Sequence, residues 1–183
     1  ESINETGTHW EVQELSGVEI LEKCEHIREN LSEEVRRVTD FCQSGGAGGG
    51  MTFLSFEKAL LVMMAGLGRL FILLFLCSCH RNLKLDEWVV GGIYRIKDQF
   101  AERTIKTAYG PVTYIRTYLL MKKGGGGFFP LDTRLGLTGD GFSPLVIGLS
   151  ARLATRMSFG AAVTVFRYFL EWSPSTETVE CFV

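Results

Sequence analysis

This chain has almost no net charge. Its 19 Lys and Arg side chains nearly balance its 21 Asp and Glu side chains, which leaves a formal net charge of −2. Taken over the whole chain, that balance gives no reason to expect a polyanionic partner. The composition of a disordered protein is also missing, because 46% of the residues are hydrophobic and 22% are charged. We therefore expect the 183 residues to fold as one ordinary domain or two small ones.

An even set of cysteines is missing as well, and we expect no secretory leader. The cysteines are odd in number and irregular in spacing: Cys24, Cys42, Cys77, Cys79 and Cys181. This usage predicts free thiols in a reducing, cytoplasmic setting. The run Cys77-Ser-Cys79-His80 is not followed by the second pair that a structural zinc site needs. We therefore predict no bound metal.

The charges that are present are unevenly distributed. Residues 1–50 carry −7 and residues 51–183 carry +5. This asymmetry predicts an acidic arm beside a basic body, and a basic body suits nucleic acid or an anionic membrane. The run 43–50, QSGGAGGG, is typical of a flexible linker. We therefore place a boundary there, between an acidic arm (1–50) and a DNA-binding region (51–183).

The acidic arm has apolar residues at helical spacing from about residue 18 to residue 41. Ser16 is a predicted N-cap, and a second helix is predicted to begin at Ser32. An amphipathic helix or helix pair of this kind packs on its own domain or pairs with a second copy. A homodimer through these N-terminal helices is one predicted partnership.

The most apolar stretch is residues 59–79, ALLVMMAGLGRLFILLFLCSC, in which Arg69 is the one charge. Its length suits a bilayer-spanning helix. A charge at the centre of such a span costs roughly 2.5–3.5 kcal/mol on insertion scales, which the apolar residues would offset. Gly66 and Gly68 flank Arg69, and no second span follows. We predict a central core helix, with a membrane helix as the alternative, and expect Arg69 to have a partner or reach the surface.

A β-hairpin is predicted between residues 94 and 121. Apolar and polar residues alternate on both sides of Tyr109-Gly110-Pro111, and the second run is rich in β-branched and aromatic residues. Residues 95–134 include eight basic and three acidic side chains. A basic ribbon of this kind suits DNA phosphates. The predicted phosphate contacts come from the hairpin and the turn after it: Arg103, Lys106, Arg116, Lys122 and Lys123.

The glycine-rich run 124–127 is not a phosphate-binding P-loop, because the required Gly-Lys-Ser/Thr order is missing. Pro130 and Asp132 follow it, and we expect Asp132 to cap the next turn. Asp132 and Asp140 invite an interpretation as paired catalytic acids, but no partner with a matching role stands near them in the sequence. We predict no catalytic residue here.

The C-terminal part has the spacing of a helix-turn-helix. Ser143, Ser158 and Ser175 each stand where a helix N-cap is expected, with Pro144 at the first helical position. In such a motif, residues at the start of the recognition helix enter the major groove. We predict base-edge contacts from the third helix, by Ser175, Thr176 and Thr178. The predicted fold is α+β and mostly helical, with amphipathic N-terminal helices, a central apolar helix, a basic hairpin and this C-terminal segment.

Several of these motifs occur together in a known family. R-x-x-x-T-x-x-G-x-V-x-x-x-R-x-Y begins at Arg103, and F-P-L-D-x-x-L-G-L begins at Phe129. S-F-x-x-A begins at Ser158, and S-x-x-T-V begins at Ser175. In this order they resemble the N-terminal region of bacterial insertion-sequence transposases of the Kra type, which are DDE-type transposases. The resemblance covers about residues 53–183 and implies binding to double-stranded transposon-end DNA during transposition.

Two departures from that family limit what the resemblance implies. Relatives carry a C-x-x-C pair where this chain has Met121-Lys122-Lys123-Gly124. Their acidic triad, which binds magnesium in a complete transposase, lies beyond the matched region, so the resemblance implies no cofactor and no catalytic residue in this chain. A fragment, a truncated copy and a reused domain all fit this pattern. The alternative function is a non-enzymatic membrane-associated or protein-interaction module built around residues 59–79.

Overall fold

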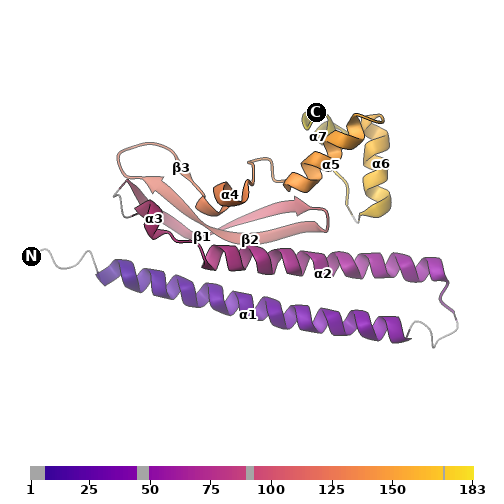
Figure 1. The fold of residues 1–183 in the computed structure, drawn as a ribbon, viewed down its shortest axis with the longest axis horizontal. Coiled ribbons are helices and arrows are strands. Elements are labelled where there is room, and N and C mark those ends of the chain that lie inside the picture. The colour runs from indigo at the N-terminus through magenta and orange to yellow at the C-terminus, as the bar shows by residue number, and fades with distance from the viewer. Residues whose placement is uncertain (1–6, 45–49, 90–92, 171) are drawn as a thin grey trace, which may run out of the picture.

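The computed structural model describes residues 7–44, 50–89, 93–170 and 172–183. It is mixed α+β and mostly helical, which confirms the predicted fold class. Two long antiparallel helices lie along a small sheet, and a group of short helices sits at one end of the sheet (Figure 1). The elements in chain order are α1 (Gly7–Ser44), α2 (Phe53–Arg81), α3 (Asp86–Val89), β1 (Tyr94–Thr107), β2 (Gly110–Met121), β3 (Gly127–Phe128), α4 (Pro130–Leu135), α5 (Pro144–Ala154), α6 (Phe159–Phe169) and α7 (Thr176–Cys181).

Residues 7–44 of the acidic arm form one continuous helix, as in the single-helix alternative, so the predicted helix starts at Ser16 and Ser32 are wrong. The Ser32 hydroxyl donates to the carbonyl of Arg28 at 3.0 Å instead of capping a new helix. Oppositely charged side chains three residues apart pair along the exposed surface, as Arg36 does with Glu33 at 2.7 Å. Such pairs each favour the helix by a few tenths of a kcal/mol, and they continue past Ser32.

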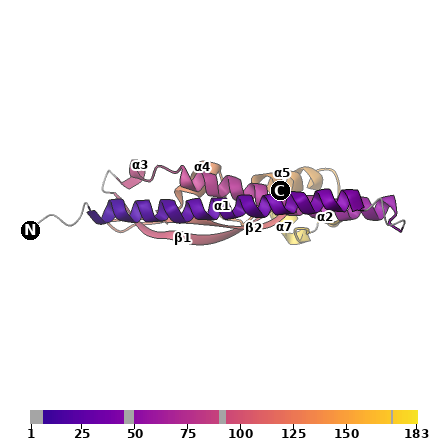
Figure 2. The same ribbon diagram turned by 90° about the horizontal axis from the view of Figure 1, so that it is seen from below.

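α2 lies between α1 and the sheet (Figures 1 and 2). Thr52 caps its N-terminus by accepting a hydrogen bond from the Ser55 amide at 3.2 Å. On the α1 side, Cys24 and Ile27 share a buried cluster with Cys77 and with Ile115 of β2. A second cluster joins Leu76 of α2 to Ile105, Val112, Tyr114 and Leu131. The acidic arm and the basic body therefore share the first cluster, and the partly buried Leu73 of α2 packs against both clusters.

The sheet is antiparallel in the order β1-β2-β3, and the tip of its hairpin is fixed to α2. Gly110 closes the turn with φ +109°, which favours glycine. The Tyr109 ring lies directly on Gly68, because a Cβ at Gly68 would come within 2.2 Å of that ring. Arg69 donates to the Tyr109 carbonyl at 3.0 Å. The hairpin turn thus supplies a partner that the sequence required for Arg69.

The last three helices form a small unit around Ala162, Val163 and Val179. Ser158 caps α6, and Ser175 caps α7, as predicted. Two aromatic residues join this unit to the hairpin tip. The Trp172 indole donates to the Thr107 carbonyl at 2.8 Å, and the Phe142 ring packs against Trp172 and Phe182.

Thiol reactivity tests the packing of α1 on α2. Cys24 and Cys77 are buried with their sulfurs 2.6 Å apart, and burial together with this contact raises the pKa of Cys77 to about 12. Because the thiolate is the reactive form, we expect Cys24 and Cys77 to resist a thiol reagent until the protein unfolds. The exposed Cys42 and Cys181 should react at once. Rapid labelling of Cys24 in the native protein, read by peptide mass spectrometry, would contradict this packing.

His80 generates a pH prediction. It is buried, its Nε2 lies 2.9 Å from the Thr117 hydroxyl, and burial, helped by the charge of Lys23, lowers its pKa from 6.5 to about 4. Between pH 6.5 and 4 the unfolded imidazole is protonated while the folded one stays neutral. The free energy of unfolding should therefore fall as the pH drops through this window, by about 3 kcal/mol in all.

Urea unfolding at a series of pH values checks the His80 prediction. His80→Gln should remove this part of the pH dependence. The matched control is His26→Gln, because His26 is exposed on α1 and its removal should leave the dependence in place. Equal pH profiles for the two variants would show that His80 is not the group responsible.

Candidate nucleic-acid interface

Two of the predicted phosphate-binding residues converge on one buried carboxylate. Arg103 of β1 donates to Asp132 Oδ2 at 2.7 Å, and Arg116 of β2 forms an ion pair with the same oxygen. The Tyr114 hydroxyl donates to Asp132 Oδ1 at 2.6 Å. Arg103 also donates to the Thr138 carbonyl. One acidic side chain of α4 thus holds groups from both long strands.

Burial decides what these arginines can do. The side chains of Arg103 and Arg116 are 10% and 14% exposed, and the Arg116 guanidinium lies 3.4 Å from the centre of the Phe129 ring. Burial also lowers the pKa of Arg116 and raises the pKa of Tyr114. The guanidinium groups are engaged in the interior, so we reassign both arginines from phosphate contact to holding α4 on the hairpin.

The prediction that Asp132 caps a turn is also wrong, because its side chain is bound elsewhere. Its carboxylate is occupied by Arg103, Arg116 and Tyr114. The turn that ends α4 is closed by backbone groups instead, with the Leu137 amide donating to the Asp132 carbonyl at 2.9 Å. Gly136 adopts φ +63° there, the usual glycine conformation at a helix C-terminus.

Lys106 lies at the tip of the hairpin beside the α5–α7 unit. Its side chain is exposed, and its ammonium group lies 5.2 Å from the centre of the Phe142 ring. Its backbone bonds to Gly141 and Ser143, which lead into α5. Lys106 is therefore a predicted phosphate contact that lies beside the start of α5.

Lys122 and Lys123 lie at the opposite, open end of the hairpin. Both are exposed, and the Lys122 amide donates to the Ile93 carbonyl at 2.8 Å. This bond places them next to the start of β1, where Arg95 and Lys97 are also exposed. We call these four side chains the basic end. Arg95 and Lys97 were not among the predicted site residues, because two register shifts in β1 separate them from the turn and hide which residues they oppose.

The two exposed basic positions are far apart. Lys106 opposes Pro111 near the turn, whereas Lys122 follows Met121 at the end of β2. Eleven residues of extended strand span about 36 Å. This separation is close to one helical turn of duplex DNA, about 34–36 Å. The hairpin can therefore present cations to phosphates one turn apart.

The predicted base-reading residues lie at the start of α7. The Ser175 hydroxyl accepts a hydrogen bond from the Thr178 amide at 3.1 Å and lies 2.8 Å from the Thr178 hydroxyl. These two side chains therefore satisfy each other as a helix cap. Thr176 is exposed in the first turn of α7. Of the three predicted residues, Thr176 has its side chain directed to solvent with no described bond to the cap.

No catalytic or metal-binding arrangement stands out among the described residues. Asp132 is paired with arginines and Asp140 is exposed in a loop. Within the same part of the chain, no group of three or more His, Cys, Asp or Glu side chains is placed to hold a metal ion. The chain matches no known family model, curated protein or solved structure.

Removing the Asp132 carboxylate tests its structural role. Asp132→Ala leaves two buried guanidinium groups without their counter-ion, and breaking a buried ion pair in this way typically costs about 3–5 kcal/mol. We expect a loss of that size in urea unfolding. Asp140→Ala, the exposed control, should change the free energy of unfolding by less than about 0.5 kcal/mol. Similar losses for both variants would remove Asp132 from the centre of the fold.

Proposed function

We propose that this chain binds double-stranded DNA, in the manner of the N-terminal region of a transposase-like protein. The observation that carries the proposal is the basic end, which groups Arg95, Lys97, Lys122 and Lys123 about one duplex turn from Lys106 and the α5–α7 unit. Cations at this spacing suit phosphates on one face of a duplex. The acidic surface of α1 belongs to a different element, whereas β1 itself has the exposed acidic residues Asp98 and Glu102 between the basic end and Lys106.

The α5–α7 unit supports a sequence-reading role within this proposal. Its helices are short, capped and packed around a shared core, as in a helix-turn-helix. Thr176 is the side chain we assign to a base edge, with Ser175 and Thr178 fixing the start of the helix that carries it. Transposon-end DNA is the duplex that the resemblance suggests, and no cleavage by this chain alone is expected.

Salt titration tests the proposal. Each phosphate contact releases counterions, so the logarithm of affinity should fall linearly with the logarithm of salt concentration. The double variant Lys122→Ala, Lys123→Ala should reduce that slope by about 1.8, at about 0.9 for each contact. Fluorescence anisotropy of a labelled duplex at several salt concentrations measures the slope.

A matched control removes two cations elsewhere. Arg36 and Arg37 are exposed on α1 and pair with glutamates there. The double variant Arg36→Ala, Arg37→Ala should leave the salt dependence of DNA affinity unchanged.

Thr176→Ala should reduce the difference in binding free energy between specific and random duplexes by roughly 1–3 kcal/mol. An absence of salt-dependent binding below about 0.1 M salt, near the concentration where the screening length is 10 Å, would refute the proposal.

A further inference from the structure

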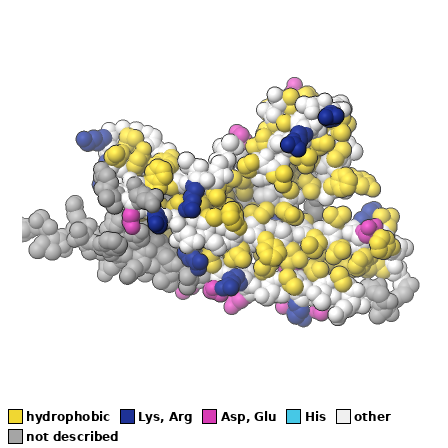
Figure 3. Space-filling model, in the orientation of Figure 1, with side chains coloured by type: hydrophobic (Ala, Val, Ile, Leu, Met, Phe, Trp, Pro, Cys, Tyr) yellow, Lys and Arg dark blue, Asp and Glu magenta, His cyan; other side chains and the backbone are white. Residues whose placement is uncertain are grey.

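α2 has an apolar side that other described elements cover only in part, since the Tyr109 ring lies on it at Gly68 and the residues on either side of that contact stay half exposed. α1 packs on one side of this helix and the sheet packs on another. Along the remaining side, large apolar side chains are about half exposed, and Figure 3 shows hydrophobic side chains forming a band along this face of the molecule. We call this set the α2 stripe: Leu54, Leu61, Met64, Phe71 and Phe75.

The spacing of the α2 stripe is that of a helix-pairing surface. Leu54, Leu61 and Phe75 fall on positions seven or fourteen residues apart, and Met64 and Phe71 form a second series seven residues apart. Repeats of seven with two apolar positions line one side of a helix and are typical of helices that pair side by side. Residue 68 of the first series is a glycine, and the Tyr109 ring lies where its side chain would be.

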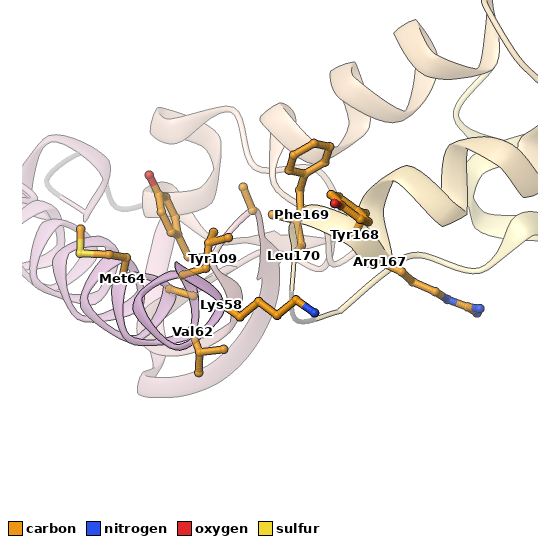
Figure 4. A pocket seen from close by; sticks show the side chains of 11 residues that line it. Lys58, Val62, Met64, Tyr109, Arg167, Tyr168, Phe169 and Leu170 are labelled. Carbon is orange, nitrogen blue, oxygen red and sulfur yellow. The ribbon is translucent and has the colours of Figure 1, made fainter. Parts of the chain in front are cut away.

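The N-terminal half of the α2 stripe borders a groove. A cavity of about 500 Å³ lies between α2 and the end of α6, and its lining includes Leu61, Met64, Tyr109, Tyr168 and Phe169 (Figure 4). Tyr168 and Phe169 are 81% and 61% exposed. The C-terminal half of the stripe presents the exposed rings of Phe71 and Phe75. The N-terminal half therefore offers a hollow, and the C-terminal half offers half-exposed rings, of which Phe75 also lines a second cavity of about 360 Å³ beside the hairpin tip.

We propose that two copies of this chain pair through the α2 stripe, with their α2 helices antiparallel. A two-fold axis near Gly68 places the partner's Phe71 and Phe75 over Leu61 and Met64, because residue 68 is midway between residues 61 and 75. The same operation places the first copy's phenyl rings over the partner's groove. A two-fold interface requires such a surface to be complementary to itself, and the α2 stripe meets that requirement.

The area available matches what a stable dimer needs. A fully exposed aromatic side chain carries about 150–250 Å², so half-exposed large side chains contribute on the order of 100 Å² each. The five stripe residues with Tyr109, Tyr168 and Phe169 then supply on the order of 800 Å² per copy, the usual amount for a stable interface. An uncovered apolar patch of that size is larger than most monomers expose.

A second protein surface fits this stripe better than a lipid bilayer does. α2 is long and apolar enough to cross a membrane by length and composition, and 17% of its most apolar window is buried. Its other sides are already in use, however. At Gly66 a Cβ would lie 3.6 Å from the Glu34 carboxylate of α1 and 3.8 Å from the Arg69 guanidinium. Insertion would strip these charges and α1 from the helix, whereas pairing leaves them in place.

Light scattering of the full chain without DNA tests the pairing. The wild type should have about twice the chain mass of 20.4 kDa. The double variant Phe71→Lys, Phe75→Lys should give the single-chain mass with unchanged helix content, because these side chains are exposed. The single variant Leu61→Lys should do the same. The dissociation constant should rise by roughly 30-fold or more for each anchor removed. A wild type that has the single-chain mass at all concentrations, or a dimer that persists in both variants, overturns the proposal.

Two further experiments test the alternatives to this dimer, which are pairing through α1 and binding to lipid. Val35 is an exposed apolar residue on α1, at 45% exposure, and Val35→Lys should leave the dimer intact. Loss of the dimer in that variant would instead assign pairing to the acidic arm and overturn the α2 interface. Flotation with phosphatidylcholine vesicles should leave the wild type in the unbound fraction. Co-flotation at high salt would identify lipid as the occupant and likewise overturn the proposal. Neither result depends on whether the chain binds DNA.

Discussion

The Asp132 carboxylate determines how the parts of this chain meet. It accepts from Arg103 and Tyr114 and pairs with Arg116, so it links β1, β2 and α4 at one buried point. Neither arginine could remain at that depth without a negative charge beside it, because an isolated buried ion is strongly unfavourable. The bond from Arg103 to Thr138 extends the same link into the loop that leads to α5. This cluster, together with the Trp172 bond to Thr107 and the backbone bonds of Lys106 to Gly141 and Ser143, sets the position of the α5–α7 unit relative to the sheet.

The sequence predicted the kinds of elements better than the roles of their side chains. Alternation located the hairpin, and capping serines located α6 and α7, because both signals are local. Arg103 and Arg116 were expected at the surface, since nothing in the sequence reveals that a carboxylate some 16 to 29 residues away will meet them inside. The position of Arg95 and Lys97 beside Lys122 was not predicted, because bulges in β1 alter the pairing that would be counted from the turn. The continuity of α1 through Ser32 depends on side-chain pairs on its surface and on packing against α2, which local capping signals do not report.

The two proposed surfaces use different chemistry on different elements. The basic end and Lys106 lie along the hairpin, and their charges act over a distance set by screening. The α2 stripe is apolar and acts only on close contact. Ion pairs on α1 reduce the acidic excess of that helix locally, since Arg28, Arg36 and Arg37 each pair with a neighbouring carboxylate. The acidic arm is thus a support for α2 that keeps an acidic excess, because residues 1–50 carry −7 and these arginines pair with only some of its carboxylates.

The contact between Tyr109 and Gly68 has a mechanical consequence. The ring fits where a Cβ would collide, and the carbonyl of the same residue is held by Arg69. The hairpin tip is therefore held on α2 by close packing and by a hydrogen bond. α2 cannot rotate about its axis without displacing the tip. Thr107, at the end of β1, is in turn bonded to Trp172 next to α7. A rotation of α2 about its axis would therefore displace the hairpin tip and, through the bond between Thr107 and Trp172, the α5–α7 unit as well.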